Sequence, residues 1–272
     1  MILFISDLHL SPRSPGATCL FLQFLAGRAR QAEALYILGD LFETWIGDDD
    51  IDGPYHAEIV AALRGASESG LQISLQHGNR DFLLGTNFAA ATGIRLLSDP
   101  HVLSTAEWQF VLSHGDALCL DDTAYMAFRT QVRNPDWQAA LLAKPLAERR
   151  AIAAHMREVS ESSQRSKDNP YTDLQVAATD DFLREHGYAT FIHGHTHQPA
   201  THDHIVDGIH VERWVLADWN EDRGECLVWD GETLSREAIT QKNQASNGVD
   251  RNKCTRCPAR RLWLPRFSWR PG

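Results

Sequence analysis

The chain has 272 residues, which is long enough to bury one sizeable core and to carry an inserted subdomain. Its formal net charge of −10 argues against a general nucleic-acid-binding protein, because an acidic surface repels the phosphate backbone. Five irregularly spaced cysteines argue against a disulfide framework and favour a reducing, cytoplasmic compartment.

The N-terminal residues 1–7 have no basic start and meet a charge at Asp7, so they predict a strand and not a signal peptide. No apolar run reaches the ~18 residues that a membrane-spanning helix needs.

Short apolar runs recur along the chain, each followed by a polar cluster, as is typical of buried strands that end in loops. Helical patterns over 19–32 and 55–69 separate the early runs, so strands and helices alternate. This alternation indicates a layered α/β fold with its functional groups where the strands end. The predicted strands are 3–5, 34–38, 71–75, 110–112, 190–192, 214–217 and 226–229.

From residue 121 to about residue 170 the pattern becomes helical, with helices expected over 125–132 and 146–160. The segment mixes arginines with apolar residues, which makes it amphipathic and partly basic. We interpret it as a helical cap inserted into a domain that spans 1–240. A pair of surface helices packing on the core would explain the pattern equally well. The apolar positions are Phe128, Trp137, Leu141, Leu142, Leu146 and Met156.

The tail over 241–272 carries eight basic residues against one acid, which leaves residues 1–240 at −17. Such a basic segment predicts a disordered extension. Its aromatic and basic residues leave open a role in binding nucleic acid or anionic lipid. Cys254 and Cys257 have the spacing of half a zinc site, but no second pair follows them.

Five short motifs follow the predicted strands and supply ligand-type side chains. Any one of them is more often a turn or a helix cap than a ligand site, whereas five in order at strand ends favour a shared site. Carboxylate, imidazole and one amide form a mixed ligand set that suits manganese, iron or zinc better than calcium. The motifs are Asp7-Leu-His9, Gly39-Asp40, Gly78-Asn79-Arg80-Asp81, His114-Gly115-Asp116 and Gly194-His195-Thr-His197.

The order of these motifs resembles the calcineurin-like metallophosphoesterase superfamily over residues 1 to about 235. The resemblance implies a four-layer α/β/β/α sandwich that hydrolyses a phosphorus ester or anhydride by attack of a metal-activated water. A carboxylate can span two cations ~3.5–4 Å apart, which suits a shared ligand. The implied ligands are Asp7, His9 and His197 for one metal, Asn79, His114 and His195 for the other, and Asp40 as the bridge; Asp40, Asn79, Arg80, His114 and His195 are the implied catalytic residues.

Arg80 departs from the superfamily pattern, in which most members have a histidine that protonates the leaving alkoxide. An arginine has a pKa above ~12 and stays charged, so it can stabilise an anion but cannot donate a proton. A phosphate monoester leaves as an anion, so Arg80 favours cleavage of a diphosphate over that of a simple ester. The alternative is that Arg80 merely pairs with Asp81.

Three longer stretches, 37–49, 77–85 and 193–200, resemble the bacterial UDP-2,3-diacylglucosamine diphosphatase family of lipid A biosynthesis. That resemblance implies a glycolipid nucleotide substrate, release of a lipid 1-phosphate and UMP, two manganese ions, and peripheral attachment to the cytoplasmic face of the inner membrane. The acidic charge of the chain predicts no nucleic-acid partner. The implied substrate contacts are Asn79, Arg80, Asp122, Ser160, Gln164, Lys167 and His195.

Part of the cap departs from this closer pattern, because the family usually has an asparagine where this chain has Gln164, and a different segment near Tyr171. How the cap meets the substrate is therefore open. Asp122 has the position of a helix N-cap, and the spacing of Ser160, Gln164 and Lys167 also fits a solvated helix face.

Two other functions remain to be separated from a lipid diphosphatase. One is a soluble phosphodiesterase or nucleotide diphosphatase of the same superfamily. The other is a binding module that keeps the fold without its metals, although all seven ligand positions are intact here.

Overall fold

The first of two sheets is built largely from the short apolar runs at the start of the chain. The computed structural model describes residues 1–165 and 173–240, with side chains over 1–158 and 173–240, so the predicted tail lies outside it. β1 to β4 run parallel, and β10 and β11 pair antiparallel at one edge. In spatial order the strands are β11 (Leu234–Thr240), β10 (Arg223–Trp229), β1 (Ile2–Ile5), β2 (Ala34–Leu38), β3 (Gln72–Gln76) and β4 (Arg95–Leu96).

The second sheet has five strands, of which β6, β7 and β9 run parallel while β5 and β8 pair antiparallel at the edges. All four residues of β7 are buried, because layers cover both faces of the sheet. In spatial order the strands are β5 (His101–Ser104), β6 (Gln109–Ser113), β7 (Thr190–His193), β9 (Ile209–Val215) and β8 (Ala200–Val206).

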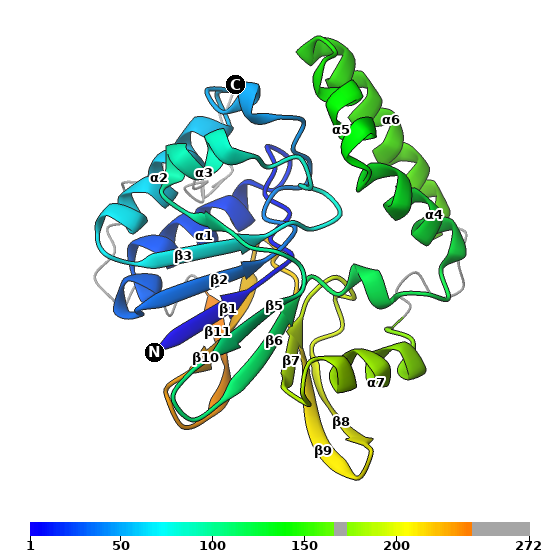
Figure 1. The fold of residues 1–272 in the computed structure, drawn as a ribbon. Coiled ribbons are helices and arrows are strands. Elements are labelled where there is room, and N and C mark those ends of the chain that lie inside the picture. Colours follow the sequence, from blue (N-terminus) through cyan, green and yellow to red (C-terminus); the bar gives the residue numbers. More distant parts are fainter. Residues whose placement is uncertain (166–172, 241–272) are drawn as a thin grey trace, which may run out of the picture.

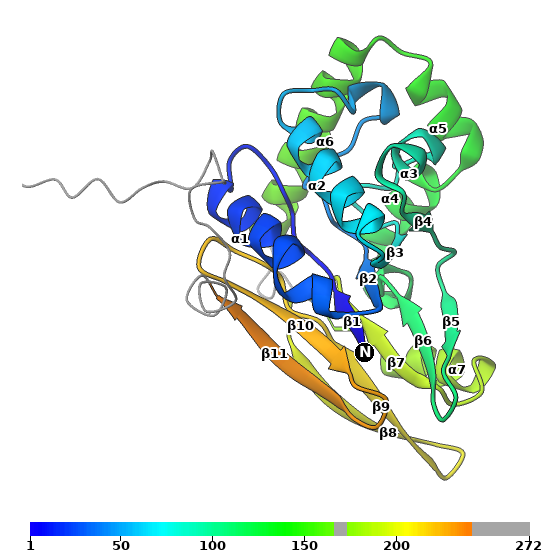
Figure 2. The same ribbon diagram turned by 90° about the vertical axis from the view of Figure 1, so that its left-hand side faces the viewer.

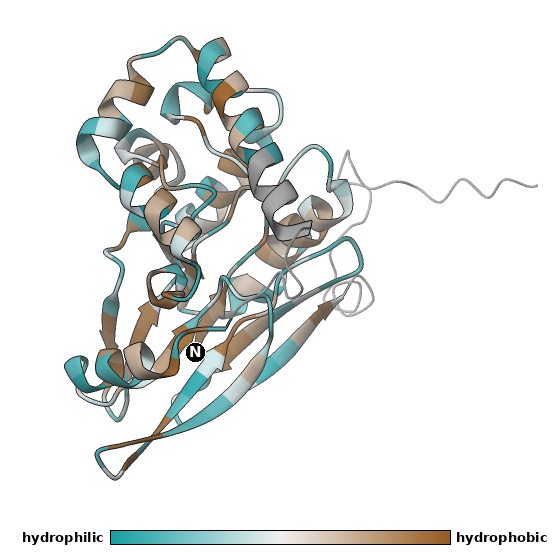
Figure 3. Ribbon diagram, turned by 90° about the vertical axis from the view of Figure 1, so that its right-hand side faces the viewer, coloured by the Kyte–Doolittle hydropathy of each residue, from teal (hydrophilic) through white to brown (hydrophobic). Residues whose placement is uncertain are grey.

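Helices α1 (Pro15–Ala26), α2 (His56–Glu68) and α3 (Thr86–Thr92) cover the outer face of the first sheet, and α7 (Val176–Glu185) covers that of the second (Figures 1 and 2). One hydrophobic cluster joins α1 to α3 to the first sheet, a second lies between the sheets, and a third lies under α7. Hydrophobic residues accordingly gather along the strands in Figure 3. The predicted four-layer α/β/β/α sandwich is confirmed.

Three further helices, α4 (Thr123–Val132), α5 (Pro135–Leu142) and α6 (Leu146–Arg165), form a separate group on the right of Figure 1. Their apolar side chains pack on the first cluster through Phe128, Trp137 and Met156, among others. The packing of surface helices on the core, which was the alternative to a cap, therefore accounts for much of this amphipathic pattern.

The arginines of this group bind the loops that follow the strands. Arg149 is 3% exposed and donates to the Ile46 carbonyl at 2.5 Å and to the Asp49 carboxylate. Arg133 donates to the Gly78 carbonyl at 3.0 Å. These hydrogen bonds from arginine side chains hold the segment against the ligand-bearing loops.

Replacing Phe110 with Ala should lower the free energy of unfolding by ~3–5 kcal/mol, because a buried phenyl ring is lost and a cavity remains. Phe110 is fully buried between the sheets, with its ring centroid 5.7 Å from that of Phe4 and 5.2 Å from that of Trp229. Urea denaturation measures the loss, and Phe110→Leu should cost less. A loss below ~1 kcal/mol for the alanine variant would contradict this packing.

Candidate metal centre

The loops after five strands bring all seven predicted ligands together. Asp7 lies two residues beyond β1, Asp40 two beyond β2, and Asn79 three beyond β3. His114 directly follows β6, and His195 lies two residues beyond β7. Because parallel strands end at the same edge of their sheet, these loops meet where the two sheets adjoin.

Asp7, His9 and His197 form the first group of donor atoms. His197 Nε2 lies 3.3 Å from Asp7 Oδ1 and 3.2 Å from His9 Nε2, and His9 Nε2 lies 3.8 Å from Asp7 Oδ1. One carboxylate and two imidazoles at this spacing can hold a single ion.

Asn79, His114 and His195 form the second group. Asn79 Oδ1 lies 3.1 Å from His114 Nε2 and 3.0 Å from His195 Nδ1. His114 Nδ1 is 2.8 Å from the Leu38 carbonyl and donates to it, so Nε2 is the ring nitrogen that faces the site.

Asp40 lies between the two groups. Its Oδ2 is 3.8 Å from His9 Nε2 and 3.7 Å from His114 Nε2. Asp7, Asp40 and His114 also place donor atoms within 4.8 Å of one another. This carboxylate is the one placed to be shared by both groups.

Backbone strain is concentrated in these ligands. Positive φ angles are uncommon for residues other than glycine and cost free energy, so they persist where the surrounding structure enforces them. Only seven such residues occur in the described part of the chain, and five of them are predicted ligands. They are Asp7 (54°), His9 (47°), Asp40 (52°), His195 (68°) and His197 (53°).

The charges of the site favour a bound cation. Burial alone would lower the pKa of His114, but Asp40, Asp7 and Asp116 raise it to about 9, so the buried site has a surplus of negative charge. Burial and the nearby His114 lower the pKa of His195 to about 4, which keeps its ring neutral, as a metal ligand must be. The donor set and its charge therefore fit a pair of divalent metal ions.

Two buried carboxylates that the ligand assignment left out hold the loops in place. Asp81 accepts hydrogen bonds from the backbone N–H groups of Leu41, Phe42 and Gly78 at 2.8 to 3.3 Å. Asp116 accepts from Tyr125 Oη at 2.8 Å and from Arg129 Nε at 2.9 Å, which ties α4 to the site. Both belong to the quoted motifs, and the resemblance assigned neither of them to a metal.

Arg80 does not pair with Asp81. The Asp81 oxygens accept from backbone groups, and within residues 1–158 and 173–240 no carboxylate forms an ion pair with the Arg80 guanidinium. Its positive charge helps to lower the pKa of Glu43, together with His9, which opposes the effect of burial. The ion-pair alternative for Arg80 is therefore wrong.

The predicted substrate contacts on the cap are only partly described. Asp122 is the N-cap of α4 and accepts from Tyr125 N at 3.2 Å, which bears out that structural role. Ser160 and Gln164 belong to α6, but their side chains lie outside the described residues, as does the whole of Lys167.

Two residues beside the ligands carried no motif of their own. The Tyr125 ring centroid lies 5.3 Å from that of His195, and Glu43 Oε2 lies 3.0 Å from His9 Nδ1. Glu43 belongs to the quoted stretch 37–49, and Tyr125 is the first residue of a predicted helix. The sequence does not show that their side chains contact the ligands.

Replacing Gly78 with Ala should abolish metal binding, because the new Cβ would lie 2.0 Å from Asp40 Oδ1 and 2.3 Å from Asp40 N. The backbone nitrogen cannot move aside without displacing the shared carboxylate. The matched control is Gly65→Ala in α2, where nothing lies within 4 Å of the added Cβ. Metal analysis of purified protein should find less than one ion per chain only in the first variant, and full occupancy there would contradict the argument.

Among the described helices, none combines the length and the apolar character needed to cross a membrane.

The family of calcineurin-like phosphoesterases matches residues 1–199 of this chain. The protein of Aromatoleum aromaticum named UDP-2,3-diacylglucosamine hydrolase is 48% identical over 229 residues, covering 84% of this chain and 93% of that protein. Proteins of the same name from Chromobacterium violaceum and Chromohalobacter salexigens are 50% and 45% identical, covering 84% and 82% of this chain and 94% and 90% of theirs. The chain therefore belongs to the calcineurin-like phosphoesterases, which use divalent metal ions, and within them to the group of the UDP-2,3-diacylglucosamine hydrolases.

Proposed function

We propose that this enzyme hydrolyses the diphosphate bond of UDP-2,3-diacylglucosamine to 2,3-diacylglucosamine 1-phosphate (lipid X) and UMP, a step of lipid A biosynthesis. The observation that carries the proposal is the convergence of seven ligand-type side chains beside an arginine that no carboxylate neutralises within the described residues. The identity of 45–50% to relatives of that name over most of both chains supports the same substrate.

In this proposal Asp7, His9 and His197 hold one ion, Asn79, His114 and His195 hold the other, and Asp40 is shared. The mixed oxygen and nitrogen set suits manganese. When bound, two such ions supply a water nucleophile at neutral pH and neutralise the phosphoryl oxygens.

Arg80 stabilises the phosphate monoester that leaves, because its guanidinium keeps its positive charge throughout the reaction. No proton donor is needed at that position. Asn79, Arg80 and His195 bind the phosphate side of the sugar, with Asp122, Ser160, Gln164 and Lys167 contributed by the cap.

A diacylated sugar resides in a bilayer, so the proposed substrate supports contact of the enzyme with a membrane surface. We propose peripheral attachment at the cytoplasmic face of the inner membrane. Each basic residue near an anionic surface would add up to ~1 kcal/mol of attraction.

The test is release of UMP from UDP-2,3-diacylglucosamine by purified protein with manganese. We expect release that stops after chelation and that returns when manganese is restored. Hydrolysis of small water-soluble diesters without UMP release would favour a soluble phosphodiesterase instead. Metal analysis should find about two ions per chain, whereas less than one would favour a scaffold without catalysis.

A further inference from the structure

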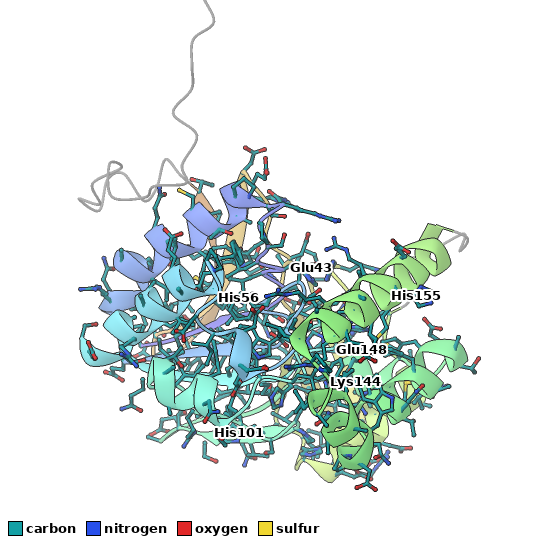
Figure 4. The ribbon with its side chains drawn as sticks, turned by 90° about the horizontal axis from the view of Figure 1, so that it is seen from above. Glu43, His56, His101, Lys144, Glu148 and His155 are labelled. Atoms are coloured by element: carbon teal, nitrogen blue, oxygen red, sulfur yellow. The ribbon has the colours of Figure 1, made fainter. Side chains whose placement is uncertain are left out.

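A cavity of about 310 Å³ lies between the core and α6, next to the first group of ligands. Its core wall includes the loop after β1, from Leu10 to Arg13, together with Glu43, Asp50 and His56. Glu43 and His56 lie on the side of the core that faces α6 (Figure 4). Because Glu43 Oε2 is 3.0 Å from His9 Nδ1, the cavity adjoins the His9 end of the site.

The cavity lies on a different face of α6 from the apolar packing. Ile152 and Met156 pack against the large hydrophobic cluster, whereas Ala153 and Arg157 line the cavity. Successive helical residues are separated by about 100°, so each lining residue is turned by about that angle from its apolar neighbour. The helix therefore separates an apolar environment from a mixed polar one.

The lining has the chemistry of a nucleotide site. Pro12 and the two alanines 153 and 154 offer apolar surface for a base. The Glu43 carboxylate contacts His9 at 3.0 Å and Arg157 at 3.5 Å and can also accept from ribose hydroxyls. Arg13 is exposed at the rim, and no carboxylate among the described side chains pairs with it. A volume of this size is at the lower end of small-ligand pockets, as a single nucleoside requires.

The position of the cavity suits a substrate whose diphosphate carries a sugar at one end and a nucleoside at the other. The other end of the site, at His195, faces the Tyr125 ring and α4, whose N-cap Asp122 is one of the proposed sugar contacts. A diphosphate that spans the ligand groups with its sugar at the His195 end directs its nucleoside to the His9 end.

We propose that this cavity binds the uridine monophosphate half of the substrate. The inference rests on the proposed function and extends it, because it assigns the nucleotide to residues that carry no predicted role. Binding there would set the preference for a nucleotide-linked lipid over the free lipid phosphate.

Filling the cavity tests the assignment. Ala153→Phe places a phenyl ring in it, and Ala151→Phe is the matched control on an exposed position of the same helix outside the cavity lining. The probes are UMP and 2,3-diacylglucosamine 1-phosphate, each measured as an inhibitor, together with the KM for UDP-2,3-diacylglucosamine. Bound metal is measured in every variant.

We expect Ala153→Phe to weaken inhibition by UMP at least tenfold and to raise KM, with bound metal unchanged and inhibition by the lipid phosphate changed less than threefold. Ala151→Phe should resemble the wild type. Arg13→Ala, a mild change on an exposed loop, should weaken UMP three- to tenfold, which keeps the test decisive if Ala153→Phe folds poorly.

Unchanged inhibition by UMP in both Ala153→Phe and Arg13→Ala would overturn the assignment, as would equal losses for UMP and the lipid phosphate. Failure of the proposed function gives a different result, since wild-type protein would then release no UMP at all. If the wild-type protein hydrolyses the substrate but the cavity variants are inhibited by UMP as strongly as the wild type, only the nucleotide site is refuted.

Discussion

Replacing Asp40 with Asn should reduce kcat by roughly 10³ or more and lower bound metal below two ions per chain, a larger effect than that of any terminal ligand. Asp40 Oδ2 lies 3.8 Å from one imidazole ligand and 3.7 Å from another, on opposite groups. Removing its charge weakens the binding of both ions, whereas His197→Asn weakens only the binding of the ion held by Asp7 and His9. The substitution keeps the shape of the side chain, and Oδ1 can still accept from Arg80 N at 2.8 Å.

Steady-state kinetics and metal analysis on the same preparations test this difference. Asp49→Asn is the control, because Asp49 carries the same charge but binds Arg149 of the cap and no ligand. It should keep both ions. Similar mild losses in Asp40→Asn and His197→Asn would rule out a shared bridge.

Strand positions could be predicted because burial on both faces leaves a clear sequence pattern. The apolar run 34–38 is β2 residue for residue, and 110–112 lies inside β6. Strands at sheet edges carried no such run. β5 alternates half-buried and exposed residues, and β8 does so over most of its length, which left both unpredicted.

The predicted helix boundaries are wrong where a proline and a glycine set the ends of the helix. A helix was predicted over 19–32, but α1 begins at Pro15 and ends at Ala26. Proline suits the first helical turn, and Gly27 follows the end, so both boundaries had a visible cause. A predicted strand over 214–217 was also placed too late, since β9 ends at Val215.

The ligand loops could be placed from the sequence because their residues follow recognisable strands, but the supporting contacts could not. Asp48 accepts from Gly85 N and Phe88 N at the start of α3. Asp49 and Asp50 bind Arg149 and Arg150 one hundred residues away. Such long-range pairs depend on how the layers meet, which one sequence does not specify.

Replacing Arg80 with Ala should lower kcat for UDP-2,3-diacylglucosamine by roughly 10²–10³ with a smaller change in KM, because the lost charge acts mainly on the leaving phosphate. Arg80→Lys keeps the charge without the planar fork and should fall between the two. Arg184→Ala is the control, because Arg184 lies in α7 and binds Asp207, which directly follows β8, at 2.7 Å.

The dependence on the leaving group separates this role of Arg80 from simple binding. A diester with a p-nitrophenolate leaving group needs little stabilisation, so Arg80→Ala should slow its hydrolysis far less than that of the diphosphate. If both reactions slow equally, the guanidinium acts on the phosphoryl group that both substrates share. If neither slows, Arg80 is not part of the reaction, and its position beside Asp40 and Glu43 would reflect charge balance alone.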